Sequence, residues 1–197
     1  MLNLDQYANP NIKLLYRDAV APAILDTFGD FSMLVAPIGT GGTLIGLSEG
    51  FRSRLGITCV GAMCAPDQEI PGMRDVKGME EVKQPWQKAL AGDLDQRIEV
   101  ERRAAFLCAP WINRLTGVPA GASGGAAYIA GCRAIQRCIE KGTLDSIRDK
   151  KTGKIKMLIV IHDDVGPYLA DRFTTEFRME DFHPSTATPP QQLIFGY

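Results

Sequence analysis

The sequence has few of the side chains that metal sites and hydrolytic sites commonly use. It contains two histidines, His162 and His183, and five cysteines, none of which forms a CxxC pair. No HExxH helix or His/Cys zinc pattern is therefore present, and a hydrolytic triad built on histidine has little support. Four cysteines lie in apolar periodic segments, where we expect buried, reduced thiols: Cys59, Cys108, Cys132 and Cys138.

The chain also lacks strong charge and long apolar runs. Its formal net charge is -1, and the sequence has no basic patch that would bind nucleic acid. Four lysines between positions 150 and 156 surround Gly153, and we expect them to lie in a solvated loop. No apolar run approaches the roughly 20 residues that cross a bilayer. The first residues lack the basic region and apolar core of a signal peptide. We expect a soluble, cytoplasmic protein with no nucleic-acid or membrane partner.

The chain is organised around a glycine-rich loop at residues 39–43. The loop reads Gly39-Thr40-Gly41-Gly42-Thr43 and joins a short apolar run at 33–36 to an apolar-periodic segment at 43–55. This pattern predicts a buried strand, a tight turn and a helix. The first N–H groups of a helix are unpaired and carry partial positive charge, so the loop is a candidate anion site.

The identity of the anion follows from what the loop does not contain. No lysine lies near it, which excludes a Walker loop, and Leu44 occupies the third glycine position of the dinucleotide fingerprint. A single phosphate on a small cofactor is the better interpretation. The alternative is a turn that needs glycine and binds nothing.

Other segments predict an α/β fold with a parallel sheet. A strand at 57–62 completes a βαβ unit with the loop. Residues 63–97 are broken by proline and glycine and are expected to be irregular. We expect helices at 16–28 (regular from Pro22), from 98 onward (kinked or divided at Pro110), at 126–141 and at 168–173, a strand at 157–161, and an irregular tail from 182.

A second glycine turn lies at residues 121–127, with the sequence GASGGAA. Like the first glycine loop, it leads into a segment that we expect to be a helix. Together with LDQYANP at 4–10, GTGGT at 39–43 and IHDDVGPYL at 161–169, it gives four motifs in a fixed order that span nearly the whole chain. In these motifs the chain resembles the C-terminal portion of the fold-type-II pyridoxal-phosphate enzymes, the group of cysteine synthase and cystathionine β-synthase.

The resemblance implies a three-layer αβα fold with a mostly parallel sheet. Residues 1–181 would form an incomplete pyridoxal-phosphate-binding large domain and residues 182–197 a C-terminal tail. By position in the motifs, the residues of the first loop would hold the cofactor phosphate, Ser123 would face the pyridine nitrogen, and Gln6 would lie near the carboxylate of an amino-acid substrate. The phosphate residues are Gly39, Thr40, Gly41, Gly42 and Thr43.

A hydroxyl at Ser123 would favour a particular type of reaction. Its pKa is too high to keep the pyridine nitrogen protonated, so the ring would be a moderate electron sink. That suits elimination of a β-leaving group followed by replacement, and it disfavours transamination. The alternative is that Ser123 caps the helix that follows it.

The chain lacks the family's lysine and departs from the family's pattern at three further positions. His162 stands where a proline is usual, Asp164 where a serine is usual, and Arg74 where a glycine is common. The Schiff-base lysine in its Ser-x-Lys-x-Arg setting is absent, as is the Thr/Ser-Ser-Gly-Asn loop that grips the substrate carboxylate. His162 and Asp163 would lie beside the cofactor ring at the end of a strand, where His162 is either a ring contact or part of a capped strand end. Arg74 either recognises an anionic second substrate or lies in solvent.

These observations leave three hypotheses. The chain is one part of a cysteine synthase-like lyase or transferase of amino-acid biosynthesis, acting on a serine-derived substrate, and an N-terminal half or a partner chain supplies the lysine. Alternatively, it is an inactive pseudoenzyme that serves as a binding or regulatory module, or a binder of some other phosphate ligand. An incomplete fold exposes an apolar face, so we expect a homo-oligomer or a complex with a complementary chain.

Overall fold

The computed structural model of the chain describes residues 9–81 and 85–164. Four predictions lie outside these residues: the role of Gln6, the helix at 168–173, the boundary between residues 181 and 182, and the irregular tail from 182. Within the described part, no helix has the length and apolar character that crossing a membrane requires.

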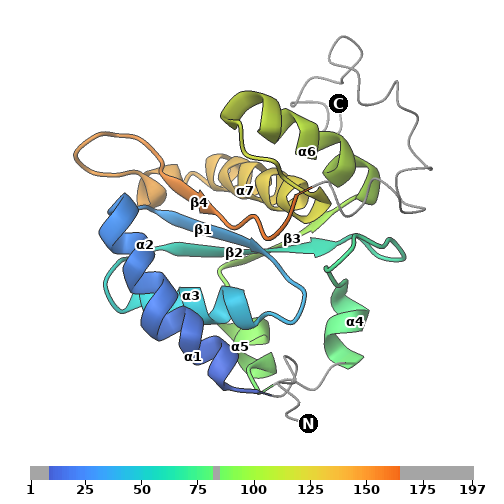
Figure 1. Cartoon of the computed structure of the whole chain (residues 1–197). Helices are drawn as coiled ribbons and strands as arrows, with labels where there is room; N and C mark the ends of the chain where they lie inside the picture. The colour runs from blue at the N-terminus through green and yellow to red at the C-terminus, as the bar shows by residue number, and fades with distance from the viewer. Residues whose placement is uncertain (1–8, 82–84, 165–197) are drawn as a thin grey trace.

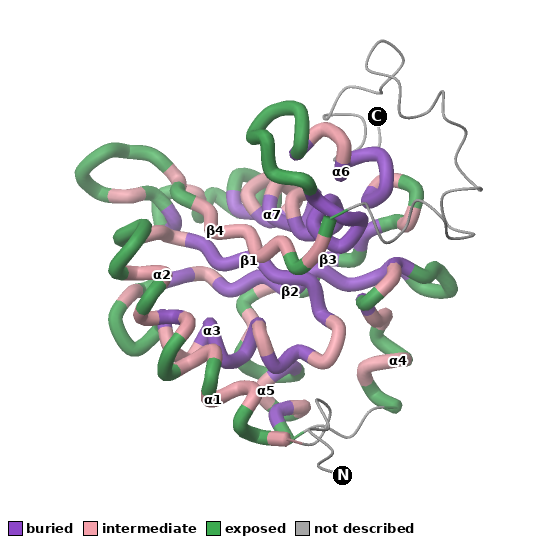
Figure 2. Tube along the Cα trace, in the orientation of Figure 1, coloured by how far each residue is buried: buried purple, intermediate pink, exposed green. Residues whose placement is uncertain are grey.

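A four-stranded parallel sheet forms the centre of the molecule (Figure 1). The strands lie in the order β3-β2-β1-β4, and every neighbouring pair is parallel. Strands buried on both faces are typically apolar along their whole length, as β1 and β2 are here (Figure 2). Their bounds are Met33–Pro37 for β1, Thr58–Cys64 for β2, Gln96–Val100 for β3 and Met157–Ile159 for β4.

Helices cover both faces of the sheet, which gives the expected three layers (Figure 1). One face carries α6 (Arg102–Thr116) and α7 (Ala122–Glu140). The other carries α1 (Asn11–Leu15), α2 (Ala21–Phe28), α3 (Gly42–Arg52) and α5 (Gln87–Gly92). Side chains of β1 alternate between the two apolar cores, because successive residues of a strand point to opposite faces. The three-layer αβα fold with a parallel sheet is confirmed.

The first helical segment is longer than predicted. It begins at Asn11, not at Tyr16, and includes a π-helical turn, η1 (Tyr16–Val20), between α1 and α2. The side chain of Asn9 accepts a hydrogen bond from the N–H of Asn11 at 3.0 Å, which satisfies one of the free donors at the start. Pro22 lies in the first turn of α2, directly after the wide π turn, where its missing N–H interrupts no α-helical ladder.

The prediction of a helix from residue 98 was wrong, because residues 96–100 form the edge strand β3. Ile98 and Val100 are buried and alternate with exposed Arg97 and Glu99, which is the period of a half-buried strand. The helix α6 begins only at Arg102, and it continues through Pro110 without dividing. Its apolar face packs into the core, which offsets the hydrogen bond lost at the proline.

The segment expected to be irregular contains two short helices, α4 (Val76–Glu81) and α5. The helix α7 also starts earlier than predicted, at Ala122, so Ser123 belongs to its first turn. A Cβ added to Gly125 would lie 2.1 Å from the carbonyl oxygen of Ala105 in α6. The two helices therefore pack at a distance that only glycine allows at this position.

The remaining described segment connects α7 to β4. It contains a short 3-10 helix, η2 (Leu144–Ile147), and the lysine-rich loop. The four lysines of that loop are exposed, as expected: Lys150, Lys151, Lys154 and Lys156.

The two edge strands of the sheet differ in how well they are protected from pairing with a further strand. At β3, Arg133 of α7 donates to the carbonyl oxygen of Glu99 at 2.7 Å, and Arg137 donates to that of Arg97 at 3.4 Å. These contacts and the charged side chains protect the edge from further pairing. In contrast, β4 is apolar and half-buried, and it pairs only with β1 in the described part of the chain.

Candidate functional site

A cavity of ≈ 550 Å³ opens at the carboxyl ends of the strands. It lies next to the ends of β1 and β4, where the chain leaves β1 for α3 on one face of the sheet and reaches β4 from α7 on the other. Such a switch point is where ligands bind in open α/β sheets. The lining residues come from five places in the sequence: the first helix, the glycine loop, residues 71–74, Ser123, and residues 162–163.

The glycine loop forms one wall of the cavity. Gly39, Thr40, Gly41 and Thr43 line it, and Gly42 is buried behind them as the first residue of α3. Gly41 has a φ of +81°, a conformation that favours glycine. The first N–H groups of this 11-residue helix, which have no partner within the helix, therefore lie next to two threonines that line the cavity.

The opposite wall is built by residues 71–74, which follow β2. The N–H of Arg74 donates to the carbonyl oxygen of Ile38 at 2.9 Å, and its own carbonyl oxygen accepts from the N–H of Cys64 at 3.1 Å. These bonds tie the segment to the ends of β1 and β2. A Cβ added to Gly39 would lie 2.4 Å from the carbonyl oxygen of Gly72, so the two walls meet backbone to backbone.

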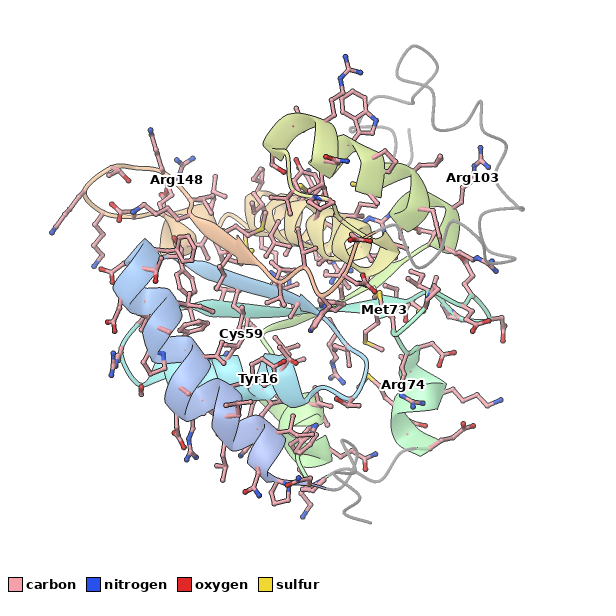
Figure 3. The ribbon with its side chains drawn as sticks, in the orientation of Figure 1. Tyr16, Cys59, Met73, Arg74, Arg103 and Arg148 are labelled. Carbon is pink, nitrogen blue, oxygen red and sulfur yellow. The ribbon has the colours of Figure 1, made fainter. Side chains whose placement is uncertain are left out.

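Arg74 is a half-buried residue of this wall and does not simply lie in solvent. Its guanidinium donates to the carbonyl oxygen of Gly78 at 3.4 Å. In Figure 3, Arg74 lies beside α4 while Tyr16 comes from the first helix on the other side of the molecule, and both residues line the cavity. Arg74 is the one arginine among the described residues that line the cavity.

Ser123 closes the cavity from the start of α7. The residue is 5% exposed, and its Oγ lies 3.5 Å from Oδ1 of Asp163, a long contact at the limit of hydrogen bonding. The N–H of Gly121 donates to the carbonyl oxygen of Asp163 at 2.9 Å, which joins α7 to the end of β4. The interpretation of Ser123 as the helix cap was wrong, because Gly121 occupies the N-cap position.

His162 lies at the mouth of the cavity, next to Asp163. Its side chain still reaches solvent. Partial desolvation lowers the pKa of His162 below its usual value, and the neighbouring Asp163 carboxylate acts in the opposite direction. The histidine is therefore neutral near pH 7 and has one nitrogen that can accept a proton.

Residues behind the glycine loop were missed in the sequence. The indole N–H of Trp86 donates to the carbonyl oxygen of Thr40 at 2.8 Å, and Leu90 of α5 packs against Gly41. Both residues are buried. Their spacing of four residues is one helical turn, a local signal of α5 that the prolines and glycines around it obscured.

The structure thus brings together the predicted site residues that it describes, with Gly42 just behind the wall. None of the described residues that line the cavity is a lysine. Lys13, on the first helix, is ion-paired to Glu49 at 2.7 Å. No group of three or more metal-ligating side chains occurs among the described residues. The arrangement can hold an anion at the glycine loop and offers a neutral hydroxyl across from it.

Two curated proteins are similar to the chain in sequence. It is 28% identical to a cystathionine beta-synthase of Dictyostelium discoideum over 164 residues, which are 76% of this chain and 33% of that protein. It is also 28% identical to a cysteine synthase of Helicobacter pylori strain J99 over 143 residues, 68% of this chain and 46% of that protein. The chain therefore spans about half the length of these relatives or less. No protein-family model matches it.

A solved structure has the same fold. The O-acetylserine-dependent cystathionine beta-synthase of Helicobacter pylori superposes with a TM-score of 0.64 at 23% identity, covering 85% of this chain and 52% of the other. The resemblance to the fold-type-II pyridoxal-phosphate enzymes that the four motifs indicate is confirmed, over part of the length of those enzymes.

Proposed function

We propose that this chain is one part of a pyridoxal-phosphate-dependent enzyme that eliminates or replaces the β-substituent of a serine-derived amino acid. One observation carries the proposal: the glycine loop, at the start of α3, and Ser123, at the start of α7, line the same cavity. None of the described residues that line this cavity is a lysine. The similarity to a cysteine synthase and a cystathionine beta-synthase supports the class of reaction.

The glycine loop fits the phosphate of the cofactor. The approach of Gly39 to the carbonyl oxygen of Gly72 leaves no room for a side chain, and Gly41 adopts a conformation that favours glycine. Such a loop at a helix start presents N–H groups to an anion, and the dipole of α3 adds partial positive charge. The hydroxyls of Thr40 and Thr43 would donate to the remaining phosphate oxygens.

Ser123 fits the pyridine end of the cofactor. When bound, pyridoxal phosphate supplies an electron sink for bond breaking at the α- and β-carbons of an amino acid. A neutral hydroxyl beside the pyridine nitrogen donates a hydrogen bond but no full proton, which moderates that sink. His162 and Asp163, on the adjacent strand end, would lie near the same region, where the neutral imidazole could hold a proton.

The amine that attaches the cofactor would come from elsewhere. The chain matches 33% and 46% of its two curated relatives, so the remaining part of such a protein has no counterpart here. Among the residues that the structure describes, β4 pairs only with β1, so its other, apolar edge is where we place a further strand. We infer that a complementary segment or partner chain brings a lysine to the open side of the site, and that this chain alone is inactive.

Reconstitution with a lysine-bearing chain tests the proposal. The chain is mixed with pyridoxal phosphate, with and without the portion of the Helicobacter pylori cysteine synthase that it does not match, and then reduced with borohydride. Absorbance near the visible edge and a reduced cofactor adduct are expected only in the mixture, with the adduct on the added chain. A phosphate-protected adduct on a lysine of this chain alone would overturn the proposal.

The same absence of a lysine supports a second candidate, an inactive module that binds a cofactor-like phosphate and regulates a complete enzyme. The two candidates differ in one observation. A part of an enzyme gains turnover of O-acetylserine when its complement is added, whereas a regulatory module changes only the activity that the added protein already has.

A further inference from the structure

Trp86 makes the one side-chain hydrogen bond to the glycine loop that the structure records among its described residues. Its indole N–H donates to the carbonyl oxygen of Thr40 at 2.8 Å. The side chain is 3% exposed and lies behind the loop, since it packs against Gly42 and is not part of the cavity wall. A buried indole N–H needs an acceptor, so this contact also satisfies Trp86 itself.

The bond sets the direction of the next N–H group. The peptide that joins Thr40 to Gly41 is trans, as are all peptides of the described chain, and its C=O and N–H therefore point in opposite directions. Because the carbonyl of Thr40 points back to the indole, the N–H of Gly41 points away from it. Gly41 lies in the cavity wall, so its N–H is turned to the side where the cavity lies.

A restraint of this kind is needed because glycine permits the opposite arrangement. Gly41 has a φ of +81° and no side chain, so the peptide before it can rotate by half a turn at low steric cost. Rotation would place the carbonyl oxygen of Thr40 in the cavity, where it would repel an anion.

We propose that Trp86 is a positioning residue for the phosphate site: its indole N–H holds the Thr40–Gly41 peptide so that the N–H of Gly41 donates to the bound phosphate. This inference rests on the proposed function, because it assigns the phosphate to the loop. It concerns a residue from α5 and its preceding turn, outside both glycine motifs.

The variant that tests it is Trp86→Phe, which keeps an aromatic ring against Gly42 and removes the donor. The matched control is Trp111→Phe, in the only other tryptophan of the chain. Trp111 lies in α6 on the opposite face of the sheet, and its buried indole N–H has no hydrogen-bond partner in the described structure. Titrations with pyridoxal phosphate and with inorganic phosphate measure binding, and the ¹⁵N–¹H signal of Gly41 reports the peptide orientation.

We expect Trp86→Phe to bind both ligands about tenfold more weakly, the size of one lost hydrogen bond to a charged group. Its Gly41 signal should be doubled or broadened, whereas the parent chain and Trp111→Phe should give one sharp signal. Unchanged affinity together with an unchanged Gly41 signal in Trp86→Phe would overturn the inference.

Failure of the proposed function and failure of the inference about Trp86 give different results. If the parent chain binds neither ligand, the proposed function fails, while the Gly41 signal still tests whether Trp86 orients the peptide. If Trp86→Phe does not fold, replacement of Trp86 by benzothienylalanine, which has the shape of tryptophan without the N–H, gives the same test. Equal affinity and an equal Gly41 signal in that protein would contradict the inference.

Discussion

The backbones of Gly39 and Gly72 approach so closely that a Cβ added to Gly39 would lie 2.4 Å from the carbonyl oxygen of Gly72. This contact joins the glycine loop after β1 to the segment after β2, and both segments line the cavity. A methyl group at Gly39 must push the two segments apart.

We therefore expect Gly39→Ala to lower the free energy of unfolding by about 1–3 kcal/mol, the usual cost of overpacking, and to weaken phosphate binding. Urea denaturation and calorimetric titration measure the two effects. Gly56→Ala is the control, because Gly56 has no atom within 4 Å of an added Cβ and no positive φ. Equal stability and equal phosphate affinity in the two variants would contradict this reading of the loop.

The substitution Ser123→Ala tests whether Ser123 and the glycine loop contact different parts of pyridoxal phosphate. We expect it to weaken binding of pyridoxal phosphate about fivefold, the size of one neutral hydrogen bond, and to leave the affinity for inorganic phosphate unchanged. The reason is that Ser123 comes from the start of α7 and the phosphate loop from the start of α3. Calorimetry with both ligands gives the comparison. A parallel loss for both ligands would place Ser123 in a structural role instead.

The lowered pKa of His162 predicts how stability depends on pH. Because the pKa lies below the unfolded value of about 6.5, the unfolded chain binds more protons in the interval between the two values. The contribution to stability is therefore present above pH 6.5 and is lost as the pH falls through the folded pKa. The difference in unfolding free energy between the parent chain and His162→Gln, measured from pH 7.5 to pH 5, should change in that direction. A constant difference would show that the imidazole is not desolvated.

Buried thiols should resist modification in the folded chain. Burial raises the pKa of Cys108 to about 12, and it raises the pKa of Cys59 and Cys64 as well. The reactive thiolate is therefore nearly absent at pH 8. Mass spectrometry after iodoacetamide treatment should find these three cysteines unmodified without urea and modified with it. Rapid alkylation of Cys108 in the folded chain would contradict the packing of α6 on the sheet.

Local signals made the geometry of the glycine loop predictable from the sequence. A strand with only apolar residues, such as β1, followed by a turn that requires glycine, specifies its own geometry in a few consecutive residues. The strand β4 was predicted in the same way, although it ends at Ile159 and not at residue 161. The start of α7 was predicted four residues too late, and Ser123 was singled out by its place in the GASGGAA motif.

Contacts between distant segments were not predictable in the same way. The alternation in β3 is a local signal of a half-buried strand, but nothing local shows that Gln96 pairs with Val60 of β2. Trp86 reaches Thr40 across 46 positions of the sequence, and Asp163 reaches Ser123 across 40. Such pairs leave no local pattern, because they depend on how the sheet places the ends of its strands.

We predict that this chain binds pyridoxal phosphate through the phosphate, at the loop from Gly39 to Thr43, and without a covalent bond of its own. A calorimetric comparison of pyridoxal phosphate with pyridoxal tests it most directly. We predict that pyridoxal phosphate binds reversibly, that inorganic phosphate displaces it, and that pyridoxal binds at least tenfold more weakly, because it lacks the group that the loop holds. Equal affinity for the two compounds, or no binding of either, would contradict the claim.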